Sequence, residues 1–541
     1  MKKLFSSFFG KNNGDDAEEP HIPWMHTPSI YDYILDNLDP ETGRLIEAGW
    51  TLPDEERRYA DTKLRWVPGA LDGTLGHHGS PDSENEKANL ISIHLANIAN
   101  HNDLKDKIAL YNLLLEDDLV GYIDLAIDKI TQSNIPPYPN VNDFVLFLLK
   151  NAPDRGPVKF AIAILGIMRS KSEIDDVSLL GKHEEFTLYS AVALSNILEE
   201  PEFALWDLAK AVDGWGKIHL VERLSSTKTA EIKSWLLLEG YRNSIMYEYL
   251  AHTCATAGDL RGAISADQVD DALLDATAEI IEALIAGGPA QDIDDYRDAA
   301  FVITRFLEHL QTRANNLTHL TVVDSILGFL SIDSWDTAEK ELNGWDEQTR
   351  DSAIQMSQAI IQQPQWMPLA LAGLKSEDNL TFYIANRAAQ IVGIDTWEYH
   401  WRRLQNKPLE AHNWFQIMSH ATHENIEMIM AFAAQALPLD QIATGAAEES
   451  GFGPDFAIHM CLDAILQELK QYPMVGWPLV AASLKSPVIR NRNMALRALS
   501  EWSRDNWGEE VESTLIESQL VEPRDDVRER IRKVLSGEPF E

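Results

Sequence analysis

Residues 479–502 read LVAASLKSPVIRNRNMALRALSEW, two apolar segments that meet at Pro487. The second segment spaces its small and aliphatic side chains three and four residues apart, which predicts a helix with one buried face. Similar phrases, in which a basic or polar residue precedes small and aliphatic ones, recur at 187–194, 217–224, 350–356 and 528–535. This recurrence predicts helix pairs stacked side by side, because one pair alone cannot bury its apolar face.

Helical patterns fill most of the chain, and short breakers separate them. The breakers contain proline or glycine, which interrupt helices, and lie at 135–139, 287–289 and 363–364. Period-two alternation, which indicates strands, is almost absent. We therefore predict an all-α fold, an α-solenoid of stacked antiparallel helix pairs with a small irregular module at its N-terminus.

Composition divides the chain into five predicted parts. Residues 1–20 carry a short apolar stretch and then an acidic run, and we expect a disordered leader there. Residues 21–82 contain tryptophans among many prolines and glycines, which favours turns and predicts a separate module or cap. Helical repeats follow in two halves, 83–288 and 289–472, and the most regular repeats occupy 473–541.

The C-terminal residues carry a family resemblance. Residues 479–502 resemble a HEAT repeat, with Pro487 leading into its second helix, and residues 515–535 resemble the next repeat. The resemblance to the HEAT and armadillo superfamily is weaker around 183–250 and 290–400. It implies an α-solenoid, and in that superfamily the function is usually protein binding.

A second resemblance depends on phrases in the first half of the chain. Proteins of a bacterial family labelled limonene hydroxylase are similar to DPETG at 39–43, AGW at 48–50, GALDG at 69–73, GHHG at 76–79 and DGWGKIH at 213–219. This resemblance implies an oxygenase that acts on a small molecule. The sequence contains no complete haem-thiolate, dinucleotide-binding or iron-ligand motif, so we expect no cofactor. An enzyme with its site in the N-terminal module is the alternative function.

The net charge of the chain indicates which kind of partner it can bind. Lys and Arg total 46 against 85 for Asp and Glu, a formal net charge of -39, so the field of the molecule repels nucleic acid and favours a basic protein. The two cysteines, Cys254 and Cys461, offer neither a disulfide framework nor a metal pair and indicate a reducing cytoplasm. No apolar run reaches the roughly 18 residues of a membrane-spanning helix.

Acidic residues gather at helical spacing on either side of a Gly-Gly-Pro break. Carboxylates that line one concave face would attract a cationic protein and speed its association. We predict non-catalytic binding of a basic partner, as by an inhibitor or immunity-type protein; ordinary helix capping and nucleic-acid mimicry are the alternatives. The predicted partner-binding residues are Asp267, Asp270, Asp271, Asp275, Asp292, Asp294, Asp295, Trp50 and Trp66.

Two histidine groups are candidate ligand or metal sites. His77 and His78 occupy a predicted glycine-flanked loop, and His420, His423 and Glu427 fall on one face of a predicted helix. Imidazole and carboxylate groups bind transition metals, but neither spacing matches a defined site. A structural turn and a solvated helix face are the simpler interpretations, and we predict no metal centre.

The C-terminal repeats are richer in basic residues than the rest of the chain. A basic end could seat a carboxylate-rich partner or a second copy of the chain. The interpretation we favour is structural, with arginines that bridge acids of the neighbouring repeat. The residues concerned are Arg490, Arg492, Arg497, Arg504, Arg524, Arg528, Arg530, Arg532 and Lys533.

Overall fold

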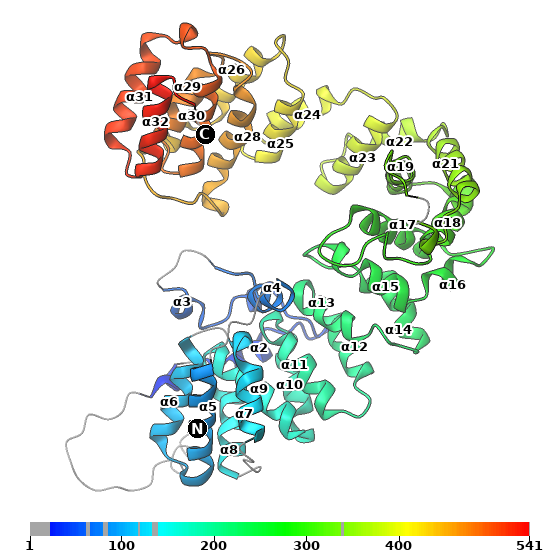
Figure 1. The fold of residues 1–541 in the computed structure, drawn as a ribbon, viewed down its shortest axis with the longest axis vertical. Helices are drawn as coiled ribbons and strands as arrows, with labels where there is room; N and C mark the ends of the chain where they lie inside the picture. Colours follow the sequence, from blue (N-terminus) through cyan, green and yellow to red (C-terminus); the bar gives the residue numbers. More distant parts are fainter. Residues whose placement is uncertain are drawn as a thin grey trace. The chain divides into compact units, whose positions relative to one another are not determined.

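The computed structural model describes residues 22–26, 28–60, 65–78, 85–116, 119–132, 139–336 and 340–539. Figure 1 traces them as helices joined by turns. Within these ranges the backbone forms no strand and only two isolated bridges, Leu38 with Leu45 and Glu449 with Val488. The prediction of an all-α fold of neighbouring helix pairs is confirmed. The leader predicted at 1–20 lies outside the described residues.

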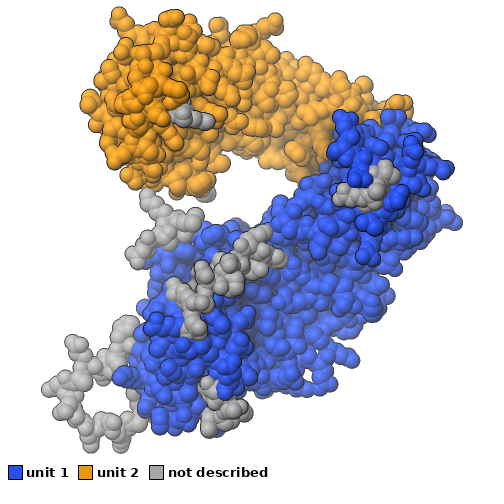
Figure 2. All heavy atoms as spheres, viewed as in Figure 1, with its two compact units in different colours: residues 1–314, 322–360 blue, residues 315–321, 361–541 orange. Residues whose placement is uncertain are grey.

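The chain divides into two compact units, which Figure 2 shows in different colours. Unit 1 comprises residues 1–314 and 322–360, and unit 2 comprises residues 315–321 and 361–541. The helix α19 (Leu317–Leu330) contributes residues to both units. No described helix combines the length and apolar character that a membrane crossing requires.

The first part of unit 1 is irregular, as its proline and glycine content predicts. Its elements are η1 (Pro23–Met25), α2 (Ile30–Asp36), η2 (Glu47–Trp50), α3 (Glu55–Arg58) and α4 (Ala70–His78). Gly73 lies inside α4 and packs on Trp215 of α13 (Gly214–Arg223); a Cβ at this position would lie 2.3 Å from the indole ring. The absence of a side chain therefore lets α4 lie directly on α13.

The rest of unit 1 is a series of helices and short helical turns, and its main helices pack as neighbouring pairs. They are α5 (Asn85–His101), α6 (Leu104–Glu116), η3 (Leu119–Gly121), α7 (Ile123–Gln132), α8 (Pro139–Asn151), α9 (Arg155–Met168), η4 (Lys171–Glu173), α10 (Ile174–Leu180), α11 (Glu184–Ile197), α12 (Glu202–Ala211), α13, α14 (Ala230–Trp235), η5 (Leu236–Gly240), η6 (Tyr247–Tyr249), α15 (Ala251–Ala257), α16 (Leu260–Ile264), α17 (Asp271–Ala286), α18 (Ala299–Arg313), η7 (Glu341–Asn343) and α21 (Glu347–Ile361). Helices α9, α11 and α13 lie side by side, and α8, α10 and α12 each pack against the helix that follows.

Unit 2 repeats the same arrangement. Its elements are α22 (Trp366–Gly373), α23 (Asn379–Ile391), α24 (Trp397–Asn406), α25 (Ala411–Ser419), α26 (Ile426–Ala436), α27 (Leu439–Ile442), η8 (Pro454–Phe456), α28 (Ala457–Leu469), α29 (Trp477–Leu484), α30 (Ile489–Glu501), η9 (Arg504–Asn506), α31 (Glu509–Val521) and α32 (Asp525–Ser536). Helices α25, α28, α30 and α32 pack in succession, while α29 and α31 pair with α30 and α32. The segments 479–502 and 515–535 are thus helix pairs, drawn in orange and red in Figure 1.

Candidate functional site

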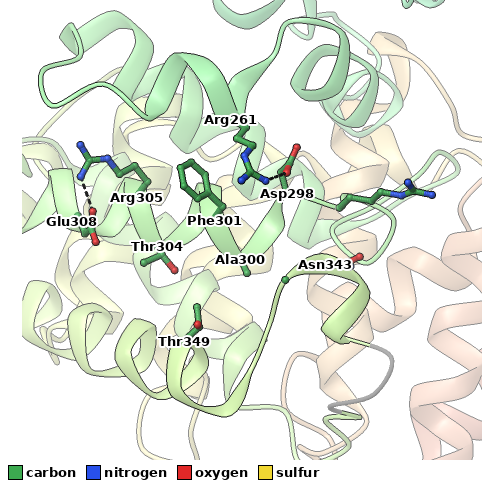
Figure 3. A pocket seen from close by; sticks show the side chains of 11 residues that line it. Arg261, Asp298, Ala300, Phe301, Thr304, Arg305, Glu308, Asn343 and Thr349 are labelled. Atoms are coloured by element: carbon green, nitrogen blue, oxygen red, sulfur yellow. Dashed lines mark hydrogen bonds and ion pairs between the residues drawn. The ribbon is translucent and has the colours of Figure 1, made fainter.

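A pocket of about 370 Å³ opens in unit 1 between α16, α18 and the segment from η7 to α21. Helix α18 presents one face to it, because Phe301, Arg305 and Glu308 recur at helical spacing. Figure 3 shows Phe301 between two ion pairs, Arg305 with Glu308 on one side and Arg261 with Asp298 on the other. The pocket therefore combines an aromatic surface with charged walls.

The charged walls are held by close contacts. Nη1 of Arg261 lies 2.5 Å from Oδ1 of Asp298, and its guanidinium centre lies 4.5 Å from the centroid of the Phe301 ring. Arg305 contacts Asp267 at 3.2 Å, in addition to its pair with Glu308. These contacts fix both guanidinium groups beside the aromatic ring.

The pocket also contains a buried polar atom. Oγ1 of Thr304 is buried there and makes no hydrogen bond to any described residue. Among the described residues that line the pocket there is no histidine, cysteine or lysine.

Three of the predicted acids lie around the start of α17. Asp270 caps the helix by accepting a hydrogen bond of 2.7 Å from a backbone N–H of its first turn. Asp271 pairs with Arg313, and Asp267 pairs with Arg305. The side chains of Asp267 and Asp271 are still 104% and 72% exposed. Capping and ion pairing thus account for where these acids lie and leave the carboxylates accessible.

Three other predicted acids do not join that group. Asp292 accepts a hydrogen bond of 2.8 Å from Asp294 N–H, Asp295 accepts one of 3.2 Å from Asp292 N–H, and Asp294 pairs with Lys340. These three follow the end of α17, whereas Asp275 lies within that helix, one turn after Asp271. Because the 16 residues of α17 span about 24 Å, the two acidic groups lie at opposite ends of one helix.

The candidate residues of the N-terminal module lie in two settings. His77 and His78 end helix α4, so the glycine-flanked loop predicted for them is wrong. The helix runs through Gly73 because that glycine packs on α13, and the two histidine side chains lie outside the described structure. Trp50 and Trp66 are 58% and 41% exposed.

The helix predicted over residues 420–427 is also wrong. Helix α25 ends at Ser419 and α26 begins at Ile426, so His420 and His423 lie in a turn and only Glu427 lies on a helix. Asn425 closes this turn by accepting a hydrogen bond of 2.7 Å from the N–H of Thr422, a local bond that competes with the helix. No group of three or more His, Cys, Asp or Glu side chains in the described part of the chain could hold a metal ion.

A buried ionic network, which sequence reasoning missed, joins the irregular part of unit 1 to α9 and α11. Nζ of Lys159 donates to Oδ2 of Asp72 at 2.6 Å and to Oε1 of Glu185 at 2.7 Å. The three residues are 3%, 3% and 8% exposed. Burial alone would lower the pKa of Lys159, but the two carboxylates hold it above its ordinary value. The ammonium group therefore stays charged inside the protein.

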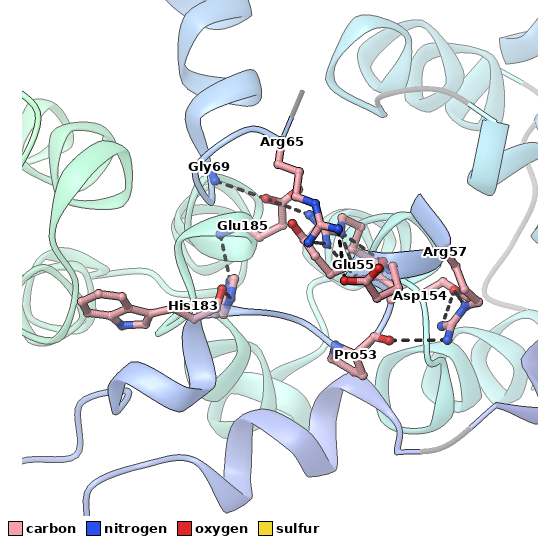
Figure 4. A network of polar contacts seen from close by, with 12 residues as sticks. Pro53, Glu55, Arg57, Arg65, Gly69, Asp154, His183 and Glu185 are labelled. Carbon is pink, nitrogen blue, oxygen red and sulfur yellow. Dashed lines mark hydrogen bonds and ion pairs between the residues drawn. The ribbon is translucent and has the colours of Figure 1, made fainter. Parts of the chain in front are cut away.

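The network continues through Arg155, one helical turn before Lys159. Its Nη2 donates to Oδ1 of Asp54 at 2.9 Å and to Oε2 of Glu55 at 2.5 Å. Figure 4 shows Glu185, which accepts a hydrogen bond of 3.2 Å from Gly69 N–H. Its Oε2 also lies 3.6 Å from Nη1 of Arg155, so Glu185 links the two cations. Acids from the N-terminal segments thus hold cations of α9. The only sequence signal was this pair of cations four residues apart in an otherwise apolar helix.

The carboxyl group of Glu184, the first residue of α11, is also buried. Burial raises its pKa to about 8, although backbone N–H groups near the start of α13 oppose this shift. Its Oε2 accepts a hydrogen bond of 3.4 Å from Gly216 N–H. Gly214 has a φ of +50°, and a Cβ there would lie 2.5 Å from the same oxygen. Glycine at this position therefore leaves room for the carboxyl group.

We expect Glu184→Gln to remove a pH-dependent loss of stability. The folded state binds the proton up to pH about 8, whereas the unfolded chain releases it near the ordinary value of 4.5. Unfolding therefore becomes easier as the pH rises through this window, by up to about 1.4 kcal/mol per pH unit. As the pH is raised from 5 to 8, the thermal midpoint of the wild-type chain should approach that of Glu184→Gln and then fall below it.

The matched control for this experiment is Glu200→Gln, at an exposed position three residues after the end of α11. Its midpoint should follow that of the wild-type chain at every pH. A constant difference between Glu184→Gln and the wild type across the range would show that Glu184 is already ionised at pH 5, which contradicts the prediction.

Two of the C-terminal basic residues bridge to acids of neighbouring helices, which is the structural role that we favoured. Both side chains of the pair Arg492 and Glu522 are 1% exposed, and their atoms lie 2.8 Å apart; Arg490 pairs with Asp463 of α28. Other arginines pair with acids only a few residues away in the chain: Arg524 with Asp526, Arg528 with Asp525, and Arg532 with Glu529 and Glu538. Arg497, in contrast, is exposed on α30.

Comparisons with known proteins add little to this description. No protein-family model matches the chain, and no curated protein sequence matches it. One matching solved structure, described as the crystal structure of an engineered protein, is 17% identical and covers 83% of this chain and 98% of its own chain, with a TM-score of 0.21. At that TM-score the match supports no argument about fold or function.

Proposed function

We propose that this chain binds a basic protein partner through unit 1 and performs no chemistry itself. The observation that carries the proposal is the exposure of Asp267, which pairs with Arg305 of the Phe301 pocket, and of Asp271, which pairs with Arg313 further along α18. A net charge of -39 draws cationic proteins toward the molecule at long range. The exposed ring then offers an apolar contact on which a partner side chain can settle.

The packing of successive helix pairs supports a HEAT-like arrangement for a protein that binds a partner. Successive helix pairs contact mainly their neighbours, an arrangement that presents long continuous surfaces to partners. We place the encounter in the cytoplasm, because both cysteines are unpaired and buried. An inhibitor or immunity-type role fits such a protein, since charge attraction speeds capture of a basic target.

The phrases shared with proteins labelled limonene hydroxylase fall on residues with packing roles. Gly73 lies against Trp215, Gly214 accommodates Glu184, and Asp72 holds Lys159. The contacts of Gly73 and Asp72 dock α4 onto α13 and α9, and the contact of Gly214 joins the starts of α11 and α13. The structural roles favour a shared architecture over a shared oxygenase reaction, so binding remains the function that we propose.

Affinity purification of the full chain at two salt concentrations tests the proposal. At about 50 mM NaCl we expect a basic protein in stoichiometric amount, and at about 300 mM NaCl we expect its loss, because salt screens exposed charges. Reversing both charges in Asp267→Lys/Asp271→Lys should reduce recovery by about tenfold, a change of about 1.4 kcal/mol in binding free energy.

The matched control reverses Glu199 and Glu200 to lysine, because both side chains are exposed and lie on another part of unit 1. This control has the same net charge as the test variant and should recover the partner normally. Equal losses in the two variants would mean that only net charge matters. Recovery of no basic partner from several growth conditions would refute the proposal.

A further inference from the structure

The outward face of α30 lines a groove in unit 2. Its inward face, which includes Arg492, Leu496 and Leu499, is buried in the core. The opposite face carries Arg490, Asn493, Met494 and Arg497, which border a groove of about 510 Å³. A volume of this size accommodates one or two large side chains of a ligand.

The far wall of the groove is anchored to the turn before α30. Three backbone hydrogen bonds hold residues 445–449 there: Gly445 N–H to Lys485 O at 2.8 Å, Glu449 N–H to Pro487 O at 3.2 Å, and Ile489 N–H to Glu449 O at 3.3 Å. These bonds fix the wall before any ligand arrives, so little ordering is needed on binding.

An exposed aromatic ring continues this wall. Phe452 is 72% exposed, and the guanidinium centre of Arg490 lies 5.2 Å from its ring centroid. Met494 adds an apolar surface on the α30 side. A ligand therefore meets a hydrophobic contact flanked by a positive charge.

The charged side chains of the groove are mainly basic. Three arginines, Arg490, Arg497 and Arg530, line it together with one acid, Glu449. Arg490 lies 2.6 Å from Asp463, and Nη1 of Arg530 donates to Oδ1 of Asn493 at 2.7 Å, while the charge of Arg530 helps to lower the pKa of Asp526. The guanidinium of Arg497 is exposed and has no ion pair with any acid that the structure describes. Planar guanidinium groups in this setting are well suited to carboxylates.

We propose that this groove binds an acidic peptide segment of a second protein. A carboxylate of the segment meets Arg497, and one large apolar side chain lies between Met494 and Phe452. The occupant is a peptide and not nucleic acid, because the strongly negative chain repels a polyanion with closely spaced phosphates more than a segment with a few carboxylates. The surface is separate from that of the proposed basic partner and has the opposite polarity.

Fluorescence anisotropy with synthetic peptides tests this inference on the full chain. The first probe carries the core Glu-Glu-Leu-Phe-Glu-Glu, the second replaces each Glu by Gln, and the third replaces Leu-Phe by Gly-Ser. We expect the first to bind at least about tenfold more tightly than either other probe. Binding should weaken as NaCl rises from about 50 to 300 mM.

Groove variants and a matched control assign the binding to this surface. Arg497→Glu and Phe452→Ser should each weaken binding of the first peptide by about tenfold or more. Arg402→Glu, a charge reversal at an exposed position on α24, should leave it unchanged. The salt series and the three wild-type titrations decide the matter even if a variant folds poorly.

Several results would overturn the inference. The three peptides could bind the wild-type chain with equal affinity, or none of them could bind. Arg497→Glu could bind the first peptide as tightly as the wild-type chain does. A single-stranded oligonucleotide could bind the wild-type chain more tightly than the first peptide does. Self-association that Arg497→Glu abolishes in sedimentation experiments would assign the groove to a second copy of the chain instead. None of these results involves the basic partner of unit 1, so the two proposals fail independently.

Discussion

Replacing Lys159 by methionine should destabilise unit 1 by about 3–5 kcal/mol, the usual effect of breaking a buried ion pair. The change leaves the carboxylates of Asp72 and Glu185 buried without the ammonium group that lies 2.6 and 2.7 Å from them. Removing one charge from a buried group of charges lowers the stability by more than the whole group had contributed to it, because the remaining charges stay desolvated. Denaturant titration of the full chain measures the loss.

The same variant should loosen α4. Asp72 connects that helix to α9 through Lys159, so hydrogen exchange in residues 70–78 should become faster in Lys159→Met. Lowering the pH toward about 4 should reduce the stability difference, because protonation neutralises the uncompensated carboxylates of the variant. The wild-type ion pair persists at this pH, since Lys159 and Arg155 hold the pKa of Glu185 far below its ordinary value.

The control for this prediction is Lys171→Met. Nζ of Lys171 lies 3.5 Å from Glu199, with side chains that are 68% and 92% exposed, so this pair is worth no more than about 1 kcal/mol. Similar losses for the two lysine variants would contradict the assigned role of the buried network.

The helix pairs could be predicted from the sequence because local pattern determines them. Apolar residues at helical spacing predict α29 and α30, and Pro487 marks the break between the end of the first and the start of the second. Neither signal depends on residues elsewhere in the chain. The bridging role predicted for the C-terminal arginines holds for Arg490 and Arg492, since stacked repeats bring basic residues of one pair close to acids of the next.

The buried network could not be predicted, because its members are far apart in sequence. Asp54 and Asp72 meet Arg155 and Lys159 only when the irregular N-terminal segments fold back onto α9. The spacing of residues along the chain does not show that these segments fold back onto α9. The cations in an apolar helix indicated that acids must lie nearby, but not which acids.

The incorrect helix at 420–427 has a local cause. Residues spaced for one helix face suggested a continuous helix, but the Thr422 to Asn425 hydrogen bond satisfies the backbone in a turn. Side-chain bonds of this kind compete with helical ones by small margins, and packing decides the outcome. The separation of the acidic groups along α17 is likewise set by where that helix begins and ends.

A second large effect is expected at Arg492. Its Nε and Nη2 donate to the two oxygens of Glu522 at 2.8 and 2.9 Å, and its Nη1 donates to the carbonyl of Ser486 at 2.7 Å. One buried side chain thus joins the turn before α30 to the turn before α32. Arg492→Met should destabilise unit 2 by about 3–5 kcal/mol, because it leaves the Glu522 carboxylate buried and without its partner. Denaturant titration measures this loss.

Replacing both partners separates the cost of the orphaned charge from the value of the pair. Arg492→Met/Glu522→Met should be more stable than Arg492→Met alone, since no uncompensated charge remains in the core. Recovery should be partial, because the Ser486 carbonyl still loses its donor. Arg532→Met, whose exposed side chain pairs with Glu529 and Glu538, should cost no more than about 1 kcal/mol. A double variant less stable than Arg492→Met would mean that Arg492 stabilises the repeat through its packing and carbonyl contacts, and not through the buried ion pair.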